Sequence, residues 1–314
     1  MKKPEKLKPF FKDYLWGGRK LITEYNKDAS YKMVAESWEL SAHSEGESII
    51  GDVKLSEFIL KYPEVLGTNC QGQDLPILIK LIDANQNLSV QVHPGDSYAK
   101  SKGYKNGKTE MWLVLENEKD AYIYLGFNQI IDEKGLLQSI DDGSIVQVLN
   151  KIRVKKGDVF FVEPGTVHAI CRGVVIIEVQ QSSNLTYRLY DYDRVDQYGF
   201  RRELHIKDAI EVLNFNVHTK ESIKQLPINK NARYESNLLV DCDYFKVYKY
   251  SVNSSVIINI TEKSFLSILI IEGTTNLTYQ ELVTEYKKGD TIFVPAQNSE
   301  IQISGYCEFV LVCL

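Results

Sequence analysis

The stretch Lys155-Lys156-Gly157-Asp158-Val159-Phe160-Phe161-Val162 has a second copy, Lys287-Lys288-Gly289-Asp290-Thr291-Ile292-Phe293-Val294. In each copy a Gly-Asp turn leads into an apolar run with the composition of a buried strand, and a proline follows shortly after. The repeat predicts two domains of similar fold. Because Gly-Asp turns are common, two unrelated hairpins are the alternative explanation.

Short apolar runs separated by turns fill much of the remaining chain. Val, Ile, Tyr and Phe dominate these runs, and Gly, Asn, Asp or Pro separate them. The expected strands are 75–82, 88–92, 111–115, 121–125, 159–162, 174–180, 245–251, 256–260, 265–271, 291–294 and 308–314. Helices are expected only at 55–66 after a possible Asp52 cap, at 130–149 with an interruption near Gly143, and at 206–213. The predicted fold class is therefore all-β, with two jelly-roll β-barrels and a few short helices.

The composition is that of an ordinary soluble protein. The 314 residues are 44% hydrophobic and 25% charged, and the formal net charge of −5 argues against a general nucleic-acid binder. Five scattered cysteines without CxxC spacing fit a reducing compartment better than a disulfide framework. The basic start lacks an apolar signal region, and no apolar run reaches the ~20 residues needed to span a bilayer. We therefore expect a cytoplasmic protein.

Two histidines and one carboxylate predict a metal site inside a barrel. Gln91 and His93 lie two apart on an expected strand and so share a face, and Glu110 begins a later strand after a Gly-Lys turn. His168 follows Gly165, where a tight turn allows close backbone approach. Two imidazoles, an amide oxygen and a carboxylate would leave a divalent ion with an open position, which fits zinc best, with Fe(II) or Mn(II) as substitutes. For either histidine alone, an ordinary core or surface position is the alternative.

Further polar residues on the same strands would face this cavity. Burying them without partners would cost a few kcal/mol each, so they should pair with one another, a metal or a ligand. These polar residues are Ser89, Glu178, Gln180 and Arg188. For Arg188, a structural salt bridge to Asp191 or Asp193 is the alternative.

The domain boundary is placed near residue 225. The polar, basic segment 219–234, which contains Pro227, is the candidate linker. Residues 1–225 are expected to form the metal-bearing catalytic domain with short helical segments, and residues 226–314 a second, similar domain. In the aligned repeat, Glu300 replaces His168 and Gln297 replaces Gly165, which predicts that the second domain lacks a metal.

Four ordered motifs resemble the signatures of type I mannose-6-phosphate isomerases. They are Gln91-Val92-His93-Pro94-Gly95-Asp96-Ser97-Tyr98-Ala99, Gly107-Lys108-Thr109-Glu110-Met111-Trp112, Pro164-Gly165-Thr166-Val167-His168-Ala169-Ile170 and Thr186-Tyr187-Arg188-Leu189-Tyr190-Asp191-Tyr192-Asp193-Arg194. Trp16-Gly17-Gly18 and Glu36-Ser37-Trp38-Glu39-Leu40-Ser41 match as well, so the resemblance covers essentially the whole chain and is close to the short bacterial form. Metal sites of cupins in general begin with a His-x-His pair, but Gln91 stands at the first of these positions here. This departure favours the isomerase family over redox cupins.

The resemblance implies a double-cupin fold and a set of site residues. The implied ligands of one zinc ion per chain are Gln91, His93, Glu110 and His168. The implied catalytic residues are Arg188, Lys108 and Glu178, and the implied substrate-binding residues are Lys80, Ser89, Lys108 and Arg188. Surface exposure in a glycine turn is the alternative for Lys108. Lys80 stands among apolar strand residues, where an unpaired ammonium would be costly.

The predicted function is zinc-dependent interconversion of mannose 6-phosphate and fructose 6-phosphate through an enediol. The metal and Arg188 would stabilise the developing negative charge. The group that moves the proton is left open: Glu178 as the base, Lys108 as its partner, or a metal-bound water. Alternatives are another metal-dependent cupin enzyme, such as an Fe(II) oxygenase or a different sugar-phosphate isomerase, and a non-catalytic sugar-binding module. The expected partner is a small phosphosugar, with no nucleic acid and no membrane, and the chain could be a monomer or a homodimer.

Overall fold

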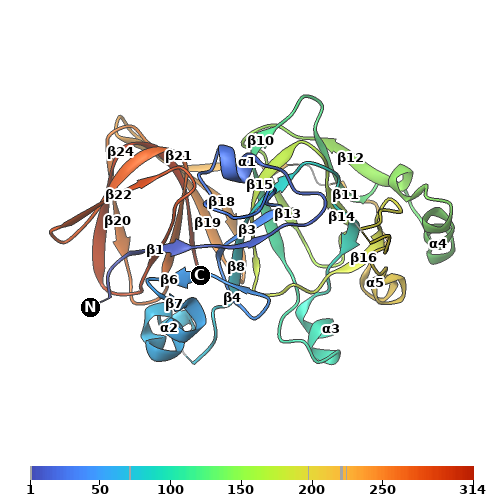
Figure 1. Ribbon diagram of the computed structural model, residues 1–314, viewed down its shortest axis with the longest axis horizontal. Coiled ribbons are helices and arrows are strands. Elements are labelled where there is room, and N and C mark those ends of the chain that lie inside the picture. Colours follow the sequence, from blue (N-terminus) through green and yellow to red (C-terminus); the bar gives the residue numbers. More distant parts are fainter. Residues whose placement is uncertain (1, 71, 197, 220–221, 224) are drawn as a thin grey trace. The chain divides into compact units, whose positions relative to one another are not determined.

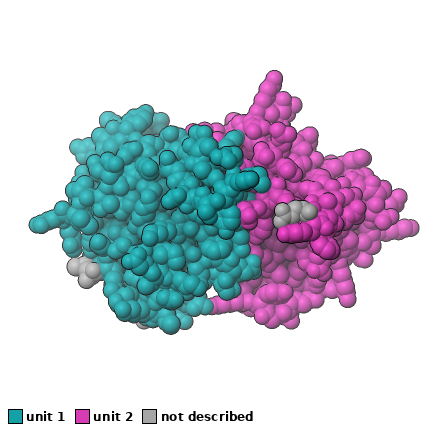
Figure 2. Space-filling model, in the orientation of Figure 1, with its two compact units in different colours: residues 1–12, 19–81, 224–314 teal, residues 13–18, 82–223 magenta. Residues whose placement is uncertain are grey.

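The computed structural model describes residues 2–70, 72–196, 198–219, 222–223 and 225–314, and β-strands dominate it (Figure 1). Contacts within the chain divide it into two compact units (Figure 2). Unit 1 comprises residues 1–12, 19–81 and 224–314, and unit 2 comprises residues 13–18 and 82–223. Among the described residues, no helix is both long enough and apolar enough to cross a membrane.

Unit 1 contains short N-terminal strands and a C-terminal set of long ones. Its helical segments are α1 (Lys20–Thr23), α2 (Leu55–Lys61), and the 3-10 turns η1 (Pro63–Leu66) and η2 (Thr68–Cys70). Its N-terminal strands are β1 (Glu5–Lys8), β2 (Phe10–Lys12), β3 (Glu36–Leu40), β4 (Ala42–His43), β5 (Gly46–Glu47), β6 (Ile49–Ile50) and β7 (Val53–Lys54). Its C-terminal strands are β17 (Leu226–Lys230), β18 (Tyr234–Asp241), β19 (Lys246–Val252), β20 (Ser255–Ile260), β21 (Leu266–Tyr279), β22 (Leu282–Lys287), β23 (Thr291–Val294) and β24 (Ser299–Cys313).

Most strands of unit 1 belong to one sheet, with the order β17-β18-β19-β24-β21-β23-β1-β6-β7. The two longest strands, β21 and β24, pair along most of their length, and β20 and β22 attach to them. Alternate residues of these strands, such as Ile268, Ile270 and Phe309, form a buried apolar core. The interior of this barrel is thus filled by apolar side chains.

Unit 2 is built from two sheets, and its longer segment begins within β8 (Ile77–Ala84). Its helical segments are α3 (Asp96–Ser101), α4 (Glu133–Asp141), η3 (Ile145–Val148) and α5 (Ile206–Val212). Its remaining strands are β9 (Val90–Val92), β10 (Glu110–Asn117), β11 (Tyr122–Phe127), β12 (Leu149–Arg153), β13 (Val159–Val162), β14 (His168–Ile170), β15 (Val174–Gln181) and β16 (Tyr187–Tyr190).

The strands of unit 2 alternate between its two sheets. In one sheet β10 lies between β13 and β15, and the other has the order β12-β11-β14-β9-β16. From β13 to β16 each successive strand joins the opposite sheet, which is the pattern of a jelly roll. The predicted all-β class, with two cupin-like jelly-roll barrels and few helices, is confirmed.

The repeated Gly-Asp turns have the same geometry in both units. Gly157 and Gly289 both have φ +92, and each donates its N–H to a neighbouring strand at 2.8 Å. The side chains of Asp158 and Asp290 each accept from the backbone N–H three residues earlier, at 2.9 and 3.0 Å. The strands that follow, β13 and β23, have the predicted limits. This equivalence supports the interpretation of the two stretches as a structural repeat.

The strand register explains why the two barrels differ in their interiors. Val162 of β13 pairs with Glu110, whereas Val294 of β23 pairs with Leu266. A leucine in the apolar core of unit 1 therefore stands where unit 2 has its buried carboxylate. Glu300, which replaces the second histidine, is exposed. The register supports the prediction that only the first barrel holds a metal.

Two of the predicted helices are shorter than expected. The segment 55–66 is α2 followed by the separate turn η1, because Pro63 interrupts the helical hydrogen bonds. Its N-cap is Lys54, so the expected Asp52 cap is wrong. The segment 130–149 is α4 and η3, separated at Gly143 with φ +72, near the predicted interruption.

The predicted linker contains regular structure. Residues 220, 221 and 224 of the segment 219–234 lie outside the described residues, but β17 within it pairs with β18. Residues 226–230 of the candidate linker therefore form a strand. Unit 1 also combines residues 1–12 and 19–81 with residues 224–314, which the predicted boundary near residue 225 separates. The division into a catalytic domain at 1–225 and a second, similar domain at 226–314 stays a prediction.

Replacing Gly289 by alanine should destabilise the protein more than the same change at Gly157. Both glycines have φ +92, which costs an L-residue about 1–2 kcal/mol. A Cβ at Gly289 would also lie 1.8 Å from the backbone oxygen of Tyr25, whereas a Cβ at Gly157 would meet no atom within 4 Å. We expect the free energy of unfolding of Gly289→Ala to fall by an additional ~1–3 kcal/mol, because the new methyl group overpacks this site.

Thermal unfolding of the two variants measures this difference. Gly157→Ala is the matched control, because it introduces the same backbone strain without the collision. Equal decreases in the melting temperature would show that the close approach of Tyr25 does not contribute.

Candidate active site

The two sheets of unit 2 bring several of the predicted site residues to the interior of one barrel. On one sheet Gln91 pairs with both His168 and Arg188, and on the other Glu110 pairs with Gln180. Residues directly opposite each other in an antiparallel pair point to the same face. The repeated alternation of side chains thus places these polar groups on the inner faces of the barrel.

His93, Glu110 and His168 form a buried cluster. His93 Nε2 lies 3.7 Å from Glu110 Oε2, and His168 Nε2 lies 3.3 Å from Glu110 Oε1. The three residues are 2%, 0% and 1% exposed, and one ligating atom from each lies within 4.8 Å of the others. In the described part of the chain, this is the single group of three His, Cys, Asp or Glu side chains that could hold a metal ion.

Both imidazoles are oriented by backbone carbonyls. Nδ1 of His93 lies 2.8 Å from the oxygen of Leu185, and Nδ1 of His168 lies 2.9 Å from that of Thr166. A carbonyl can only accept, so each Nδ1 carries the proton and each Nε2 presents a lone pair toward Glu110, as in metal-ligating histidines. Burial lowers the pKa of His168 to about 4, although the hydrogen bond to the Thr166 carbonyl acts to raise it. The ring is therefore neutral at neutral pH.

Gln91 lies at the edge of this cluster. Its Nε2 is 3.5 Å from His168 Nε2, and its Oε1 accepts a hydrogen bond from the Ser89 hydroxyl at 3.4 Å. A half-turn of the amide exchanges the two atoms and presents the oxygen to the imidazole side. The structure therefore brings Gln91 beside the three-residue group, and its role as a fourth ligand stays a prediction.

Lys108 is buried within the cluster. Its Nζ lies 2.7 Å from Glu110 Oε2, 3.1 Å from His93 Nε2 and 3.9 Å from Glu178 Oε2. The residue is 4% exposed, so the alternative of a surface lysine is wrong. Its ammonium faces the same carboxylate as the two histidines, and the carboxylate of Glu178 lies on the same side.

A compact turn fixes Lys108 and Glu110. The N–H of Gly107 donates to Asp96 Oδ1 at 2.7 Å, and the N–H of Lys108 donates to the oxygen of Pro94 at 2.9 Å. A Cβ at Gly107 would lie 2.5 Å from backbone carbon of Gly95, so only glycine fits this approach. The turn thereby joins the start of α3 to the start of β10.

A second glycine turn holds the two histidine segments together. Gly165 has φ +84, and its N–H donates to the backbone oxygen of His93 at 2.8 Å. A Cβ there would lie 2.8 Å from the oxygen of Val212. The predicted tight turn before His168 thus anchors one histidine segment directly on the other.

Arg188 points across the same sheet toward Ser89. Its Nε donates to the Ser89 hydroxyl at 3.3 Å, and its Nη1 donates to the backbone oxygen of Glu203 at 2.7 Å. Burial, followed by the charge of Arg202, lowers the pKa of Arg188.

The two aspartates near Arg188 bind other arginines. Asp191 accepts hydrogen bonds from Arg194 and Arg202, and Asp193 forms an exposed ion pair with Arg201 at 2.8 Å. The structure therefore does not support the alternative in which Arg188 serves mainly as a salt-bridge partner of these residues.

Lys80 lies in unit 1, whereas the other predicted site residues lie in unit 2. It is 3% exposed, its Nζ is 3.6 Å from Glu36 Oε2, and it lies 5.1 Å above the ring of Trp38. The indole of Trp38 donates to the same Glu36 oxygen at 2.7 Å. The buried ammonium is thus paired, as its apolar strand requires.

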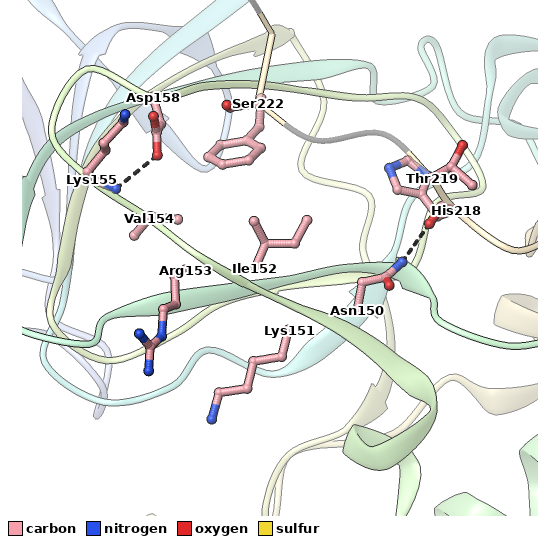
Figure 3. Close-up of a pocket in the computed structure, with 11 residues that line it drawn as sticks. Asn150, Lys151, Ile152, Arg153, Val154, Lys155, Asp158, His218, Thr219 and Ser222 are labelled. Carbon is pink, nitrogen blue, oxygen red and sulfur yellow. Dashed lines mark hydrogen bonds between the residues drawn. The ribbon is translucent and has the colours of Figure 1, made fainter.

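A cavity of about 640 Å³ in unit 2 lies apart from these residues (Figure 3). Ile152 and Val154 face its middle, and at one end Asn150 donates to the backbone oxygen of His218 at 2.8 Å (Figure 3). Its lining contains none of the residues predicted for chemistry. The convergent titratable groups are in the barrel interior, and we place the candidate site there.

Comparison with known proteins gives consistent matches along the chain. The model of the phosphomannose isomerase type I catalytic domain matches residues 5–123, and the model of the mannose-6-phosphate isomerase cupin domain matches residues 235–314. The mannose-6-phosphate isomerase ManA of Bacillus subtilis is 36% identical, over 97% of this chain and 96% of that protein. The mannose-6-phosphate isomerase of Streptococcus mutans is 35% identical, over 94% of this chain and 93% of that protein.

A solved structure agrees with the sequence comparison. The crystal structure of the mannose 6-phosphate isomerase from Bacillus subtilis matches with a TM-score of 0.92 and 32% identity, over 99% of each chain. The match extends over both barrels, as the four motifs and the repeat predict. The chain belongs to the type I mannose-6-phosphate isomerase family.

Proposed function

We propose that the chain interconverts mannose 6-phosphate and fructose 6-phosphate in the interior of the unit 2 barrel. The observation that carries this proposal is the buried group in which His93 and His168 direct Nε2 at Glu110. Its placement among Lys108, Glu178 and Arg188, in a chain of this family, favours an isomerase over an oxygenase or a sugar-binding module.

The donor atoms of this group fit a zinc ion. Two imidazole nitrogens oriented through Nδ1 and one carboxylate are the ligands that catalytic zinc sites use, and Gln91 would add an amide oxygen. Bound zinc, one ion per chain, would supply Lewis-acid polarisation of a substrate oxygen.

Arg188 would stabilise the negative charge that develops on the substrate oxygens. Aldose–ketose interconversion passes through an enediol, and its oxygens gain charge as the proton leaves carbon. A fixed donor in a water-poor site typically contributes about 3–4 kcal/mol to such a transition state. Ser89 and the Glu203 carbonyl hold the guanidinium of Arg188, which keeps its orientation fixed during the reaction.

Glu178 and Lys108 would move the proton between C2 and C1. Both side chains are buried, at 3% and 4% exposure, and lie 3.9 Å apart. A carboxylate can accept the proton from one carbon, and the neighbouring ammonium can limit charge build-up on the enediol oxygen. This assignment uses Lys108 and Glu178 because neither of them is proposed as a zinc ligand.

Lys80 and Ser89 are proposed to contact the sugar phosphate. Lys80→Met should therefore raise KM for mannose 6-phosphate by about tenfold while kcat changes less, because the lost contact acts equally in ground and transition states. Steady-state kinetics measure this separation. Lys54→Met, a change of an exposed lysine in the same unit, is the control. An unchanged KM would remove Lys80 from substrate binding.

We further propose a cytoplasmic location and a monomeric or homodimeric state. The five cysteines are all free thiols, which suits a reducing compartment. Cell fractionation tests the location and analytical ultracentrifugation the oligomeric state. Recovery in an oxidising compartment, or a sedimenting species larger than a dimer, would contradict the respective proposal.

A product assay tests the proposed reaction itself. The enzyme is incubated with mannose 6-phosphate in D₂O, and the products are followed by NMR. We expect fructose 6-phosphate, with deuterium at carbon only where the transferred proton exchanges with solvent. Binding without turnover would favour a sugar-binding module, an oxidised product would favour an oxygenase, and turnover of only other phosphosugars would change the substrate.

A further inference from the structure

The guanidinium of Arg188 depends on a loop that follows β16. Its Nη1 donates to the backbone oxygen of Glu203 at 2.7 Å, so the position of that oxygen sets the direction of the guanidinium. Two residues later, the chain returns to Arg188 itself: the N–H of Arg188 donates to His205 Nδ1 at 3.2 Å, and the N–H of His205 donates to the Arg188 oxygen at 2.8 Å. The loop is thus attached to β16 on the C-terminal side of Glu203.

On the other side of Glu203, the loop is attached by an ion pair. Nε of Arg202 donates to Asp191 Oδ2 at 2.7 Å, and its Nη2 donates to Asp191 Oδ1 at 2.5 Å. The two hydrogen bonds fix the orientation of the Arg202 guanidinium as well as its distance from the Asp191 carboxylate. Arg194 also binds Asp191 and donates to the backbone oxygen of Asn87 at 2.6 Å, which anchors the aspartate next to the segment that leads through Ser89 into β9.

Asp191 is charged and buried at this position. It is 6% exposed, and burial alone would raise its pKa, but the hydrogen bonds and charges of Arg202 and Arg194 outweigh burial and lower the pKa. A cavity of about 220 Å³ borders the pair and is lined also by Tyr14 and Trp16. On the cavity side, close packing therefore does not hold Arg202, and the ion pair supplies the constraint.

We propose that Arg202, clamped on Asp191, is a positioning residue that directs the Arg188 guanidinium through the Glu203 carbonyl. This proposal rests on the catalytic role proposed for Arg188. Loss of the clamp would release the loop on one side of Glu203 and let the guanidinium move away from the substrate oxygens. Displacements of about 1 Å at a reacting group can cost up to roughly 100-fold in rate.

Arg202→Gln tests the proposal, with Arg201→Gln as the matched control. Arg201 is the preceding residue, and its ion pair with Asp193 is exposed, at 68% and 69% of the two side chains. We expect Arg202→Gln to lower kcat about 10–100-fold with KM and zinc content near wild type, and the control to stay within about twofold. An unchanged kcat in Arg202→Gln would overturn the proposal.

A double-mutant cycle separates positioning from a general structural effect. In an Arg188→Ala background, assayed at high enzyme concentration, Arg202→Gln should lower kcat no further, because it acts through the missing guanidinium. An equal loss in both backgrounds would overturn the proposal. If Arg188→Ala alone has wild-type kcat, the proposed role of Arg188 fails, and this outcome is distinct from a failure of the clamp.

A conservative variant keeps the test valid if Arg202→Gln does not fold. Arg202→Lys retains the charge but replaces the two-point contact by a single donor. We expect kcat several-fold below wild type with an unchanged melting temperature. Full activity of Arg202→Lys would show that charge alone suffices and would overturn the positioning role.

Discussion

Replacing Glu110 by glutamine is expected to abolish zinc binding and to lower kcat/KM by about 10³-fold or more, or roughly 4 kcal/mol of transition-state stabilisation. Glu110 is the only anion among the proposed ligands, and it is fully buried between the two imidazoles. Glutamine keeps the shape but leaves a divalent ion without a neutralising ligand in a low-dielectric interior. Zinc per chain after gel filtration and turnover of mannose 6-phosphate are the two measurements.

The control for this change lies on the same strand. Glu116→Gln removes a carboxylate near the other end of β10 and should leave zinc content and turnover unchanged. One zinc ion per chain in Glu110→Gln, held as tightly as in the wild type, would show that zinc binds elsewhere.

Arg188→Ala is expected to lower kcat about 10²–10³-fold while zinc content stays at the wild-type level. Arg188 pairs with the proposed ligand Gln91 in the strand register, but the hydrogen bonds of its guanidinium go to Ser89 and to the Glu203 carbonyl. Its removal should therefore take away charge stabilisation without removing a ligand. Steady-state kinetics at saturating substrate, together with zinc analysis, distinguish these effects.

Two further variants define the cause of the loss. Arg172→Ala, at an exposed position of the same unit, is the control and should behave as wild type. Arg188→Lys should recover part of kcat, because it restores the charge but not the fixed fork of donors. Wild-type turnover in Arg188→Ala would exclude the arginine from the mechanism.

The regular parts of the fold could be predicted from local patterns, and the departures have identifiable causes. β13 and β23 have the predicted limits because a Gly-Asp turn marks where each begins. β21 and β24 run much further than 265–271 and 308–314. Gly273 and Gly305 interrupt their apolar alternation, yet a Cβ at Gly273 would lie 2.2 Å from the oxygen of Tyr306. Glycine there permits close strand pairing, which a local pattern cannot distinguish from a turn.

The ligand-type residues of the site were predictable because strand alternation fixes which side chains share a face. Gln91 and Glu110 lie on strands whose register keeps them inside the barrel, and His93 follows directly after β9. The orientation of the imidazoles was not predictable, because it depends on carbonyls such as that of Leu185, and every residue type carries a carbonyl. The Asp191–Arg202 clamp was missed for a similar reason: Arg202 stands in a charged stretch where composition does not single it out.

The most direct test of the central claim is formation of fructose 6-phosphate from mannose 6-phosphate before chelation, after removal of metal, and after addition of zinc. Metal-dependent isomerisation at the His93–Glu110–His168 group predicts that activity disappears with the metal and returns at one zinc ion per chain. The same zinc addition should not restore Glu110→Gln. Full activity in protein verified to be metal-free would contradict the account.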